Sequence, residues 1–209
     1  MDNSCIDVPT ESQGVVGVSA LGPSTRLSFY SNWGTEQTDV SAPGGDSRDF
    51  FGTDRFQSPQ NRVLSTYPQS VLATGDLDLD GVIDLDANGN PTTPRVVKDC
   101  NGSTCAYYAY QQGTSMAAPH AAGVAALIIA QHGHADTRKH GLTLEPDRVQ
   151  SILEQTAVAH ACPVQNPFVY PDPASVSEGL VARCEGTEDL NGFYGHGIVN
   201  ALNAVADPV

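Results

Sequence analysis

Short strand patterns open the chain. Residues 14–20, GVVGVSA, form a β-branched run bounded by polar residues, and residues 26–31, RLSFYS, alternate between apolar and polar positions. Both patterns are typical of β-strands. Residues 38–44, TDVSAPG, predict a further short extended segment that ends in a Pro-Gly turn. Strand signals therefore dominate the first part of the chain.

Helix patterns dominate the later part. Over residues 116–131 apolar residues surround the whole helix circumference, so this helix should be central and buried. Residues 145–157 predict an amphipathic helix, in which Pro146 suits the first turn. A last short helix is predicted over residues 199–206. Strands followed by helices indicate an α/β layer arrangement.

Two long segments follow neither pattern. Residues 46–105 are rich in Asp, Gly, Pro, Asn and Thr, and they predict a surface excursion that carries an acidic loop. Residues 160–192 predict a second loop excursion. Segments of this length inside a domain are usually functional or inserted. We therefore expect one domain over residues 1–209 that both excursions interrupt.

Composition and charge exclude some classes of partner. The chain is 40% hydrophobic and 16% charged, which is typical of a globular protein. It has 24 acidic and 10 basic residues, a net charge of −14, and its sequence contains no Lys/Arg cluster. Such a charge repels phosphate groups, so we expect neither nucleic acid nor a membrane as a partner. The sequence also lacks a run of about 18 apolar residues that would span a bilayer.

The five cysteines are spaced as in an extracellular protein. Cys100 and Cys105 flank a turn-prone tetrad, and Cys162 and Cys184 bracket a Pro-rich segment, so each pair is a candidate disulfide. Cys5 is left over, which predicts a partner outside this sequence. Free thiols are the alternative. We expect a secreted protein, although the N-terminal residues show no signal peptide.

The candidate chemistry lies in residues 110–123, YQQGTSMAAPHAAG. Gly113 allows a close backbone approach, and Ser115 then lies where the long apolar helix begins. A hydroxyl at this place meets unpaired backbone N–H groups and the positive end of the helix dipole. Those groups help to stabilise an oxyanion that forms beside the serine oxygen. An ordinary serine helix cap is the alternative.

The segment GTSMAAPH, residues 113–120, followed by Ala122-Gly123, resembles the serine active-site signature of subtilases. Residues 15–44 resemble the strands that precede the serine in that family, and residues 194–205, YGHGIVNALNAV, resemble its closing segment and terminal helix. The resemblance implies a three-layer α/β fold, in which helices flank a parallel sheet. It also implies a serine endopeptidase that hydrolyses protein or peptide substrates through an acyl-enzyme on Ser115.

The partners of this serine are not found in the sequence. In subtilases Asp and His precede the serine, and an oxyanion-hole Asn lies between His and Ser. All six histidines here follow Ser115, at positions 120, 132, 134, 140, 160 and 196, and Asp-Ser-Gly, Asp-Thr-Gly and Ala-Gly-Asn motifs do not occur. We interpret His120 as structural, and His132 and His134 as a polar helix exit.

We therefore expect an incomplete subtilisin-like fold whose N-terminal portion lies before Met1. That missing part of the same domain is then a partner of this chain. Because no group in the chain takes the serine proton, we expect the chain alone to be inactive.

Residues 75–90, GDLDLDGVIDLDANGN, contain the Asp-x-Asp-x-Asp-Gly-x-x-Asp start of a calcium loop. Calcium takes about six to eight oxygen ligands, which alternating carboxylates around a glycine turn can supply. The candidate ligands are Asp76, Asp78, Asp80 and Asp84. The EF-hand pattern fails at its twelfth position, where Ala87 stands in place of Glu. A solvated acidic loop without an ion is the alternative, and no other cofactor is expected.

Three interpretations of function remain at this point. The first is a fragment of a secreted serine endopeptidase of the subtilase type. The second is a non-catalytic remnant kept as a calcium-binding or interaction module. The third is a sedolisin-type peptidase, which shares a Gly-Thr-Ser segment but uses Glu and Asp partners. Residues 116–120, MAAPH, resemble subtilases more closely than sedolisins.

Overall fold

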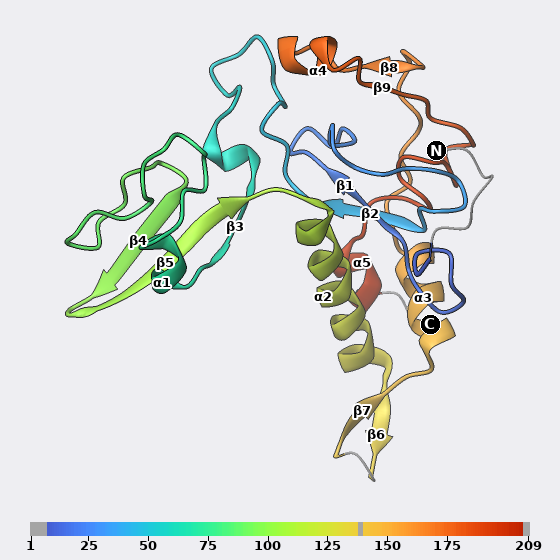
Figure 1. Ribbon diagram of the computed structural model, residues 1–209. Coiled ribbons are helices and arrows are strands. Elements are labelled where there is room, and N and C mark those ends of the chain that lie inside the picture. The colour runs from blue at the N-terminus through green and yellow to red at the C-terminus, as the bar shows by residue number, and fades with distance from the viewer. Residues whose placement is uncertain (1–7, 138–139, 207–209) are drawn as a thin grey trace.

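The structure is a computed structural model that describes residues 8–137 and 140–206. Its helices are η1 Pro59–Asn61, α1 Gln69–Leu72, α2 Thr114–His132, α3 Pro146–Gln155, α4 Pro173–Ser177 and α5 Ala201–Ala206. Its strands are β1 Val18–Leu21, β2 Val40–Pro43, β3 Val63–Thr66, β4 Val96–Asn101, β5 Thr104–Gln111, β6 His134–Asp136, β7 Gly141–Thr143, β8 Phe168–Val169 and β9 Val181–Ala182. Figure 1 shows that β3, β4, β5 and α1 form a lobe beside the part that holds β1, β2 and α2.

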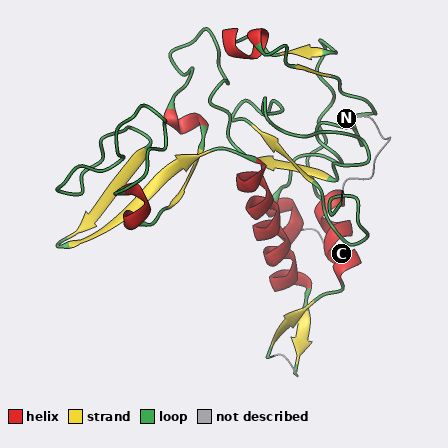
Figure 2. Ribbon diagram, in the orientation of Figure 1, coloured by secondary structure: helices red, strands yellow, loops and turns green. Residues whose placement is uncertain are grey.

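A parallel strand pair with a helix across it forms the centre of the molecule. Strands β1 and β2 pair in parallel, with Val18 opposite Val40. Helix α2 packs against both strands, and α3 and α5 pack beside α2 (Figure 2). The three predicted helices and two of the three predicted strands are therefore present. The α/β class is confirmed.

Helix α2 is buried on one face only. Ala121, Val124 and Ile128 lie in a core cluster with Val40 and the α3 leucine and isoleucine. Beside this buried face Leu127 is 46% exposed. The helix was expected to be buried on all sides, because apolar residues surround its whole circumference. In the structure the described residues pack against only one side of it.

The prediction of a strand over residues 26–31 was wrong. This segment forms a single bridge, between Leu27 and Leu21, and then turns, with the Ser31 N–H donating to the Ser28 carbonyl at 2.9 Å. The Ser31 hydroxyl accepts from the Ala20 N–H, and Ser28 and Leu27 are fully buried. The alternating pattern therefore reflects a buried turn beside β1, because its inward-facing residues include serines that bond to the backbone.

The segment 46–105 contains secondary structure that the sequence did not reveal. Strands β3, β5 and β4 form an antiparallel sheet in that order. This sheet and α1 enclose a small core of Leu72, Leu85, Val96 and Tyr107. The predicted disulfide between Cys100 and Cys105 is present, and it closes the tip of the β4–β5 hairpin.

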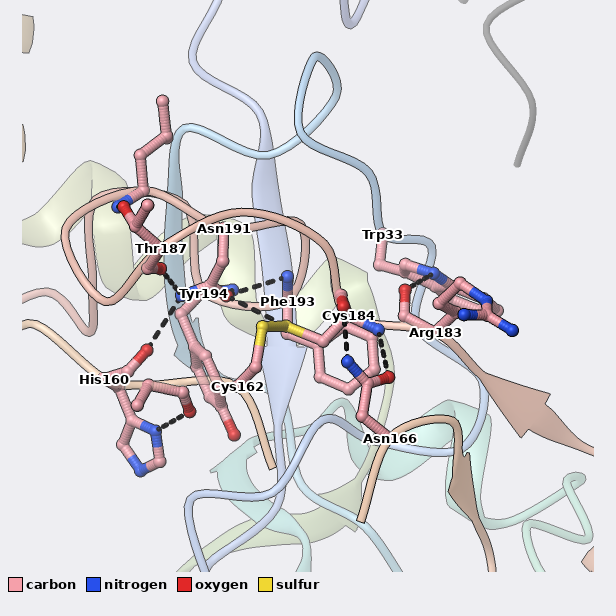
Figure 3. The surroundings of a disulfide bond; sticks show 12 residues. Trp33, His160, Cys162, Asn166, Arg183, Cys184, Thr187, Asn191, Phe193 and Tyr194 are labelled. Atoms are coloured by element: carbon pink, nitrogen blue, oxygen red, sulfur yellow. Dashed lines mark hydrogen bonds between the residues drawn. A yellow bond between two sulfur atoms is a disulfide. The ribbon is translucent and has the colours of Figure 1, made fainter. Parts of the chain in front are cut away.

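The segment 160–192 holds β8, α4 and β9, and the second predicted disulfide, Cys162–Cys184, is also present. Figure 3 shows Asn191 beside this disulfide. Its side-chain oxygen accepts from the N–H groups of Phe193 and Tyr194, and its amide donates to the carbonyls of His160 and Thr187. This fully buried amide therefore joins the excursion to the chain that follows it.

Two further observations complete the fold. Cys5 lies outside the described residues. Within the described residues, each helix is too short or too polar to cross a bilayer.

Candidate active site

Ser115 is the second residue of α2 and is exposed. Gly113 precedes the helix with φ 155°, a conformation that favours glycine. Within the described residues no side chain caps this N-terminus. The first N–H groups of α2 and the positive end of its dipole are therefore available beside the serine oxygen.

The loop before Ser115 is fixed to the end of β2. The Gly113 N–H donates to the Gly44 carbonyl at 3.0 Å. A Cβ added at Gly44 would lie 2.5 Å from the Cβ of Ala20 and 2.8 Å from the Gly113 oxygen. The chains approach so closely here that only glycine fits.

Tyr30 supports the same junction. Its hydroxyl shares one proton between the carbonyl oxygens of Gly44, at 2.8 Å, and Gly45, at 2.5 Å. Burial raises the pKa of Tyr30 to about 12, so the hydroxyl remains a donor at neutral pH. Sequence reasoning missed Tyr30, because it lies in the segment that was predicted as a strand.

Gln112 ties the serine loop to the segment after β2. Its side-chain oxygen accepts from the Ser47 N–H at 2.7 Å. Sequence reasoning gave Gln112 no role, although it directly precedes the Gly-Thr-Ser motif. Its neighbour Gln111 ends β5 opposite Val63, so the β3–β5 sheet leads directly into the nucleophile segment.

Two cavities flank Ser115. One, of about 360 Å³, is bordered by Ser115, Thr114, Asn32 and the end of the segment before β1. The other, of about 380 Å³, is bordered by Ser115, Met116, His120 and strand β3. The serine hydroxyl therefore has free space on two sides.

His120 and His132 make local contacts. The Nδ1 atom of His120 lies 2.7 Å from the Met116 carbonyl, one turn earlier in α2. The Nε2 atom of His132 lies 2.9 Å from the Ala204 carbonyl of α5. His120 therefore bonds within its own helix, and His132 joins the end of α2 to α5. Helix α2 begins at Thr114, two residues before the predicted start.

Three of the predicted calcium ligands lie together. Asp76, Asp78 and Asp80 each place a carboxylate oxygen within 4.8 Å of the others. The N–H groups of Gly81 and Asp80 donate to Asp76 at 2.8 Å and 3.1 Å, which holds the pKa of Asp76 below its usual range. Asp78 accepts from the Thr93 hydroxyl with one oxygen. Its other oxygen is buried and has no hydrogen-bond partner among the described residues.

Asp84 lies beside this group. It is 1% exposed, and both its oxygens lie 3.1 Å from the Leu77 N–H. Burial, with the nearby charges of Asp78 and Asp76, raises the pKa of Asp84. All four predicted ligands are therefore neighbours, and whether they bind calcium stays a prediction.

A comparison of the sequence with models of known protein families shows to which family the chain belongs. The subtilase family model matches residues 1–197. The chain belongs to the subtilase family. Its match includes Ser115 and both excursions, and subtilases are serine peptidases. A catalytic role for Ser115 itself stays a prediction.

Two solved structures are similar to part of this subtilase. The epidermin leader peptide processing serine protease EpiP from Staphylococcus aureus is 24% identical with a TM-score of 0.48, and the match covers 96% of this chain and 32% of EpiP. Fervidolysin from Fervidobacterium pennivorans, described as a keratinolytic enzyme related to subtilisin, is also 24% identical with a TM-score of 0.48, and the match covers 20% of it. No curated protein matches the chain. The chain thus spans about a third or less of these structures.

Proposed function

We propose that this protein is a serine endopeptidase that acts through Ser115. The carrying observation is the exposed Ser115 at the uncapped start of α2, in a chain of the subtilase family. The serine oxygen attacks a peptide carbonyl, and its proton passes to a base. The resulting oxyanion is stabilised by N–H groups, and the amine then leaves with that proton. Water hydrolyses the remaining acyl-enzyme.

The base, its orienting acid and the oxyanion-hole asparagine come, in this proposal, from protein outside residues 1–209. Two features support this. The nearest histidine in sequence, His120, is engaged with the carbonyl of Met116 in its own helix. The two cavities beside Ser115 leave room for a base on one side and an oxyanion donor on the other. We expect residues 1–209 alone to hydrolyse peptides at an undetectable rate, since loss of a triad member costs about 10⁴-fold or more.

A fluorophosphonate probe tests this proposal. We expect mass spectrometry to place the adduct on Ser115 in a protein that also supplies the proposed Asp and His, and the adduct to be absent in Ser115→Ala. Ser103→Ala is a matched control, because Ser103 is exposed at the β4–β5 turn. Peptide hydrolysis by residues 1–209 alone, lost in Ser115→Ala, would show that no outside base is needed.

The alternative function is that of a calcium-binding module. We also propose that the acidic loop binds calcium. The observation that favours it is the buried, unpartnered oxygen of Asp78 within the Asp76, Asp78 and Asp80 group. A cation there would supply the missing partner and offset the repulsion between the carboxylates of Asp76, Asp78 and Asp80.

Calorimetric titration with CaCl₂ tests the calcium proposal. We expect saturable binding that is lost in Asp78→Ala and in Asp80→Ala, but kept in Asp99→Ala. Asp99 is exposed on β4 and lies outside the carboxylate group. Equal heats in all four proteins, or no saturable heat in the unaltered chain, would remove the calcium loop. Binding without Ser115 labelling would favour the non-catalytic module.

A further inference from the structure

Three asparagines of the chain are followed directly by a glycine: Asn88, Asn101 and Asn191. In such a pair the backbone nitrogen of the glycine can attack the side-chain carbonyl carbon of the asparagine, because glycine has no side chain that would hinder the approach. The same dipeptide occurs at all three places, so the sequence alone does not rank the pairs. Their surroundings in the structure differ, and these surroundings decide which pair can react.

The pair Asn191-Gly192 is held by hydrogen bonds at both reacting groups. Asn191 is fully buried, and both the oxygen and the nitrogen of its side chain take part in hydrogen bonds. The Gly192 N–H donates to the Glu185 carbonyl at 2.8 Å. Attack would require both groups to leave these partners while they remain buried, which is costly. This pair is therefore protected as long as the chain is folded.

The pair Asn88-Gly89 lies in the acidic loop and is held at its glycine. Asn88 is exposed, but the Gly89 N–H donates to the Asp86 carbonyl at 2.9 Å. The Asp86 carboxylate also accepts from the N–H groups of Asn88 and Asn90, each at 2.8 Å. These bonds fix the turn, so the Gly89 nitrogen must lose a partner before it can approach the Asn88 side chain.

The pair Asn101-Gly102 lies at the turn between β4 and β5. Asn101 ends β4 opposite Thr104, the first residue of β5, and Gly102 has φ 62°, a conformation that favours glycine. Residues 101–104 are all exposed. Among the residues that the structure describes, neither the Gly102 N–H nor the Asn101 side chain has a hydrogen-bond partner. Both reacting groups can therefore approach each other without breaking a hydrogen bond within the protein.

We propose that Asn101 is a modification site at which the folded protein deamidates to aspartate and isoaspartate. The Gly102 nitrogen forms a bond to the side-chain carbonyl carbon of Asn101, its proton passes to water, and the side-chain nitrogen leaves as ammonia. Water then opens the cyclic imide at one of its two carbonyl carbons. Opening at one carbon gives aspartate, and opening at the other gives isoaspartate, in which the main chain runs through the former side chain.

The product changes the tip of the hairpin and not the part that carries Ser115. Figure 1 shows this turn at the end of the lobe that lies away from α2. Isoaspartate lengthens the main chain by a methylene group inside the loop that the Cys100–Cys105 disulfide closes. It also adds a negative charge to a chain whose net charge is already −14. The inference is independent of the peptidase function proposed above.

Peptide mapping by mass spectrometry tests the proposal on the folded 209-residue chain. The protein is kept at mildly alkaline pH, where the glycine nitrogen loses its proton more readily, and isoaspartate is identified with an isoaspartyl methyltransferase. We expect deamidation at Asn101 to be the fastest of the three. Asn88 should react about tenfold more slowly, as expected for one hydrogen bond that must break first. Asn191 should react only when the chain opens locally.

The unfolded chain and two variants provide the controls. In urea with a reductant all three pairs should react at similar rates, because only the shared dipeptide remains. Asp86→Ala removes the carboxylate that holds the turn at Asn88, so it should speed deamidation of Asn88 and leave the rate at Asn101 unchanged. Asn101→Gln should remove the fast reaction, because glutamine would have to form a larger ring. Thermal melting checks that each variant is folded.

Hydrogen exchange separates the longer main chain from the added charge. Protein stored until Asn101 has reacted should exchange its amide hydrogens faster at the joined ends of β4 and β5. Asn101→Asp, which adds the charge without the methylene group, should exchange as the unaltered chain does. Equal deamidation rates at Asn88 and Asn101 in the folded protein, or the same ranking of the three pairs in urea, would overturn the proposal.

Discussion

The part that carries Ser115 and the lobe that leads into it differ in strand direction and in their content of charged residues. The serine core, β1, β2 and α2, contains a parallel strand pair under a 19-residue helix without Asp, Glu, Lys or Arg. The β-lobe, residues 62–111, contains an antiparallel sheet, a loop rich in aspartate and a disulfide. Each has its own apolar cluster.

The difference shows that one region of the chain can fix the position of the serine while another region forms part of the surface around it. Apolar packing and the Gly44–Gly113 junction place Ser115. The β-lobe contributes a wall of one cavity beside Ser115 through β3. Its acidic loop is ordered mainly by hydrogen bonds to carboxylates, such as those of Asp76 and Asp86. The two regions should therefore respond differently to the same kind of substitution.

The largest expected effect comes from truncating one buried side chain in each region. Ile128→Ala and Leu72→Ala should each cost about 2–5 kcal/mol locally, because both side chains are fully buried. We expect Ile128→Ala to lower the melting temperature of the whole chain. Leu72→Ala should speed amide hydrogen exchange in β4 and β5 and leave α2 protected. Equal loss of protection in α2 and in the β4–β5 pair for Leu72→Ala would show that the two regions unfold as one unit.

A pair of glycine substitutions tests how much close packing contributes to the stability of the serine core. Gly44→Ala should reduce the free energy of unfolding by about 1–3 kcal/mol, because its Cβ would overlap Ala20 and the Gly113 oxygen. Gly123→Ala should raise it by about 1 kcal/mol, since this α2 glycine has open space around it and alanine favours helix. Urea denaturation of the two variants measures both values. A neutral Gly44→Ala would contradict the tight junction.

The smallest expected effect concerns pH and the β-lobe. The raised pKa of Asp84 means that its protonated form is favoured in the folded state. Its contribution to stability is full below the unfolded pKa of about 3.9 and is lost as pH rises through the folded pKa. Asp84→Asn should therefore flatten the decrease in β-lobe stability between acid and neutral pH, measured without calcium by hydrogen exchange. Asp99→Asn is the control, and an unchanged pH slope in Asp84→Asn would contradict this account.

The sequence by itself determined the features that depend on neighbouring residues. The helix that begins at the Gly-Thr-Ser motif, the amphipathic α3, α5 and both disulfide pairings follow from local pattern and spacing, and all are present. The family followed from the same local motifs, because GTSMAAPH is specific in itself.

Only the tertiary structure decided which distant groups meet. Residues 26–31 have a strand pattern, yet hydrogen bonds from Ala20 to Ser31 and from Ser28 to Ala20 bend them into a turn. The sheet of the β-lobe was hidden, since its strands are short and separated by polar segments. The Tyr30 contact with Gly44 and the two cavities beside Ser115 likewise depend on chain segments that are far apart in sequence. Local preference is set by each residue and its neighbours, whereas these contacts form only when packing brings their backbones together.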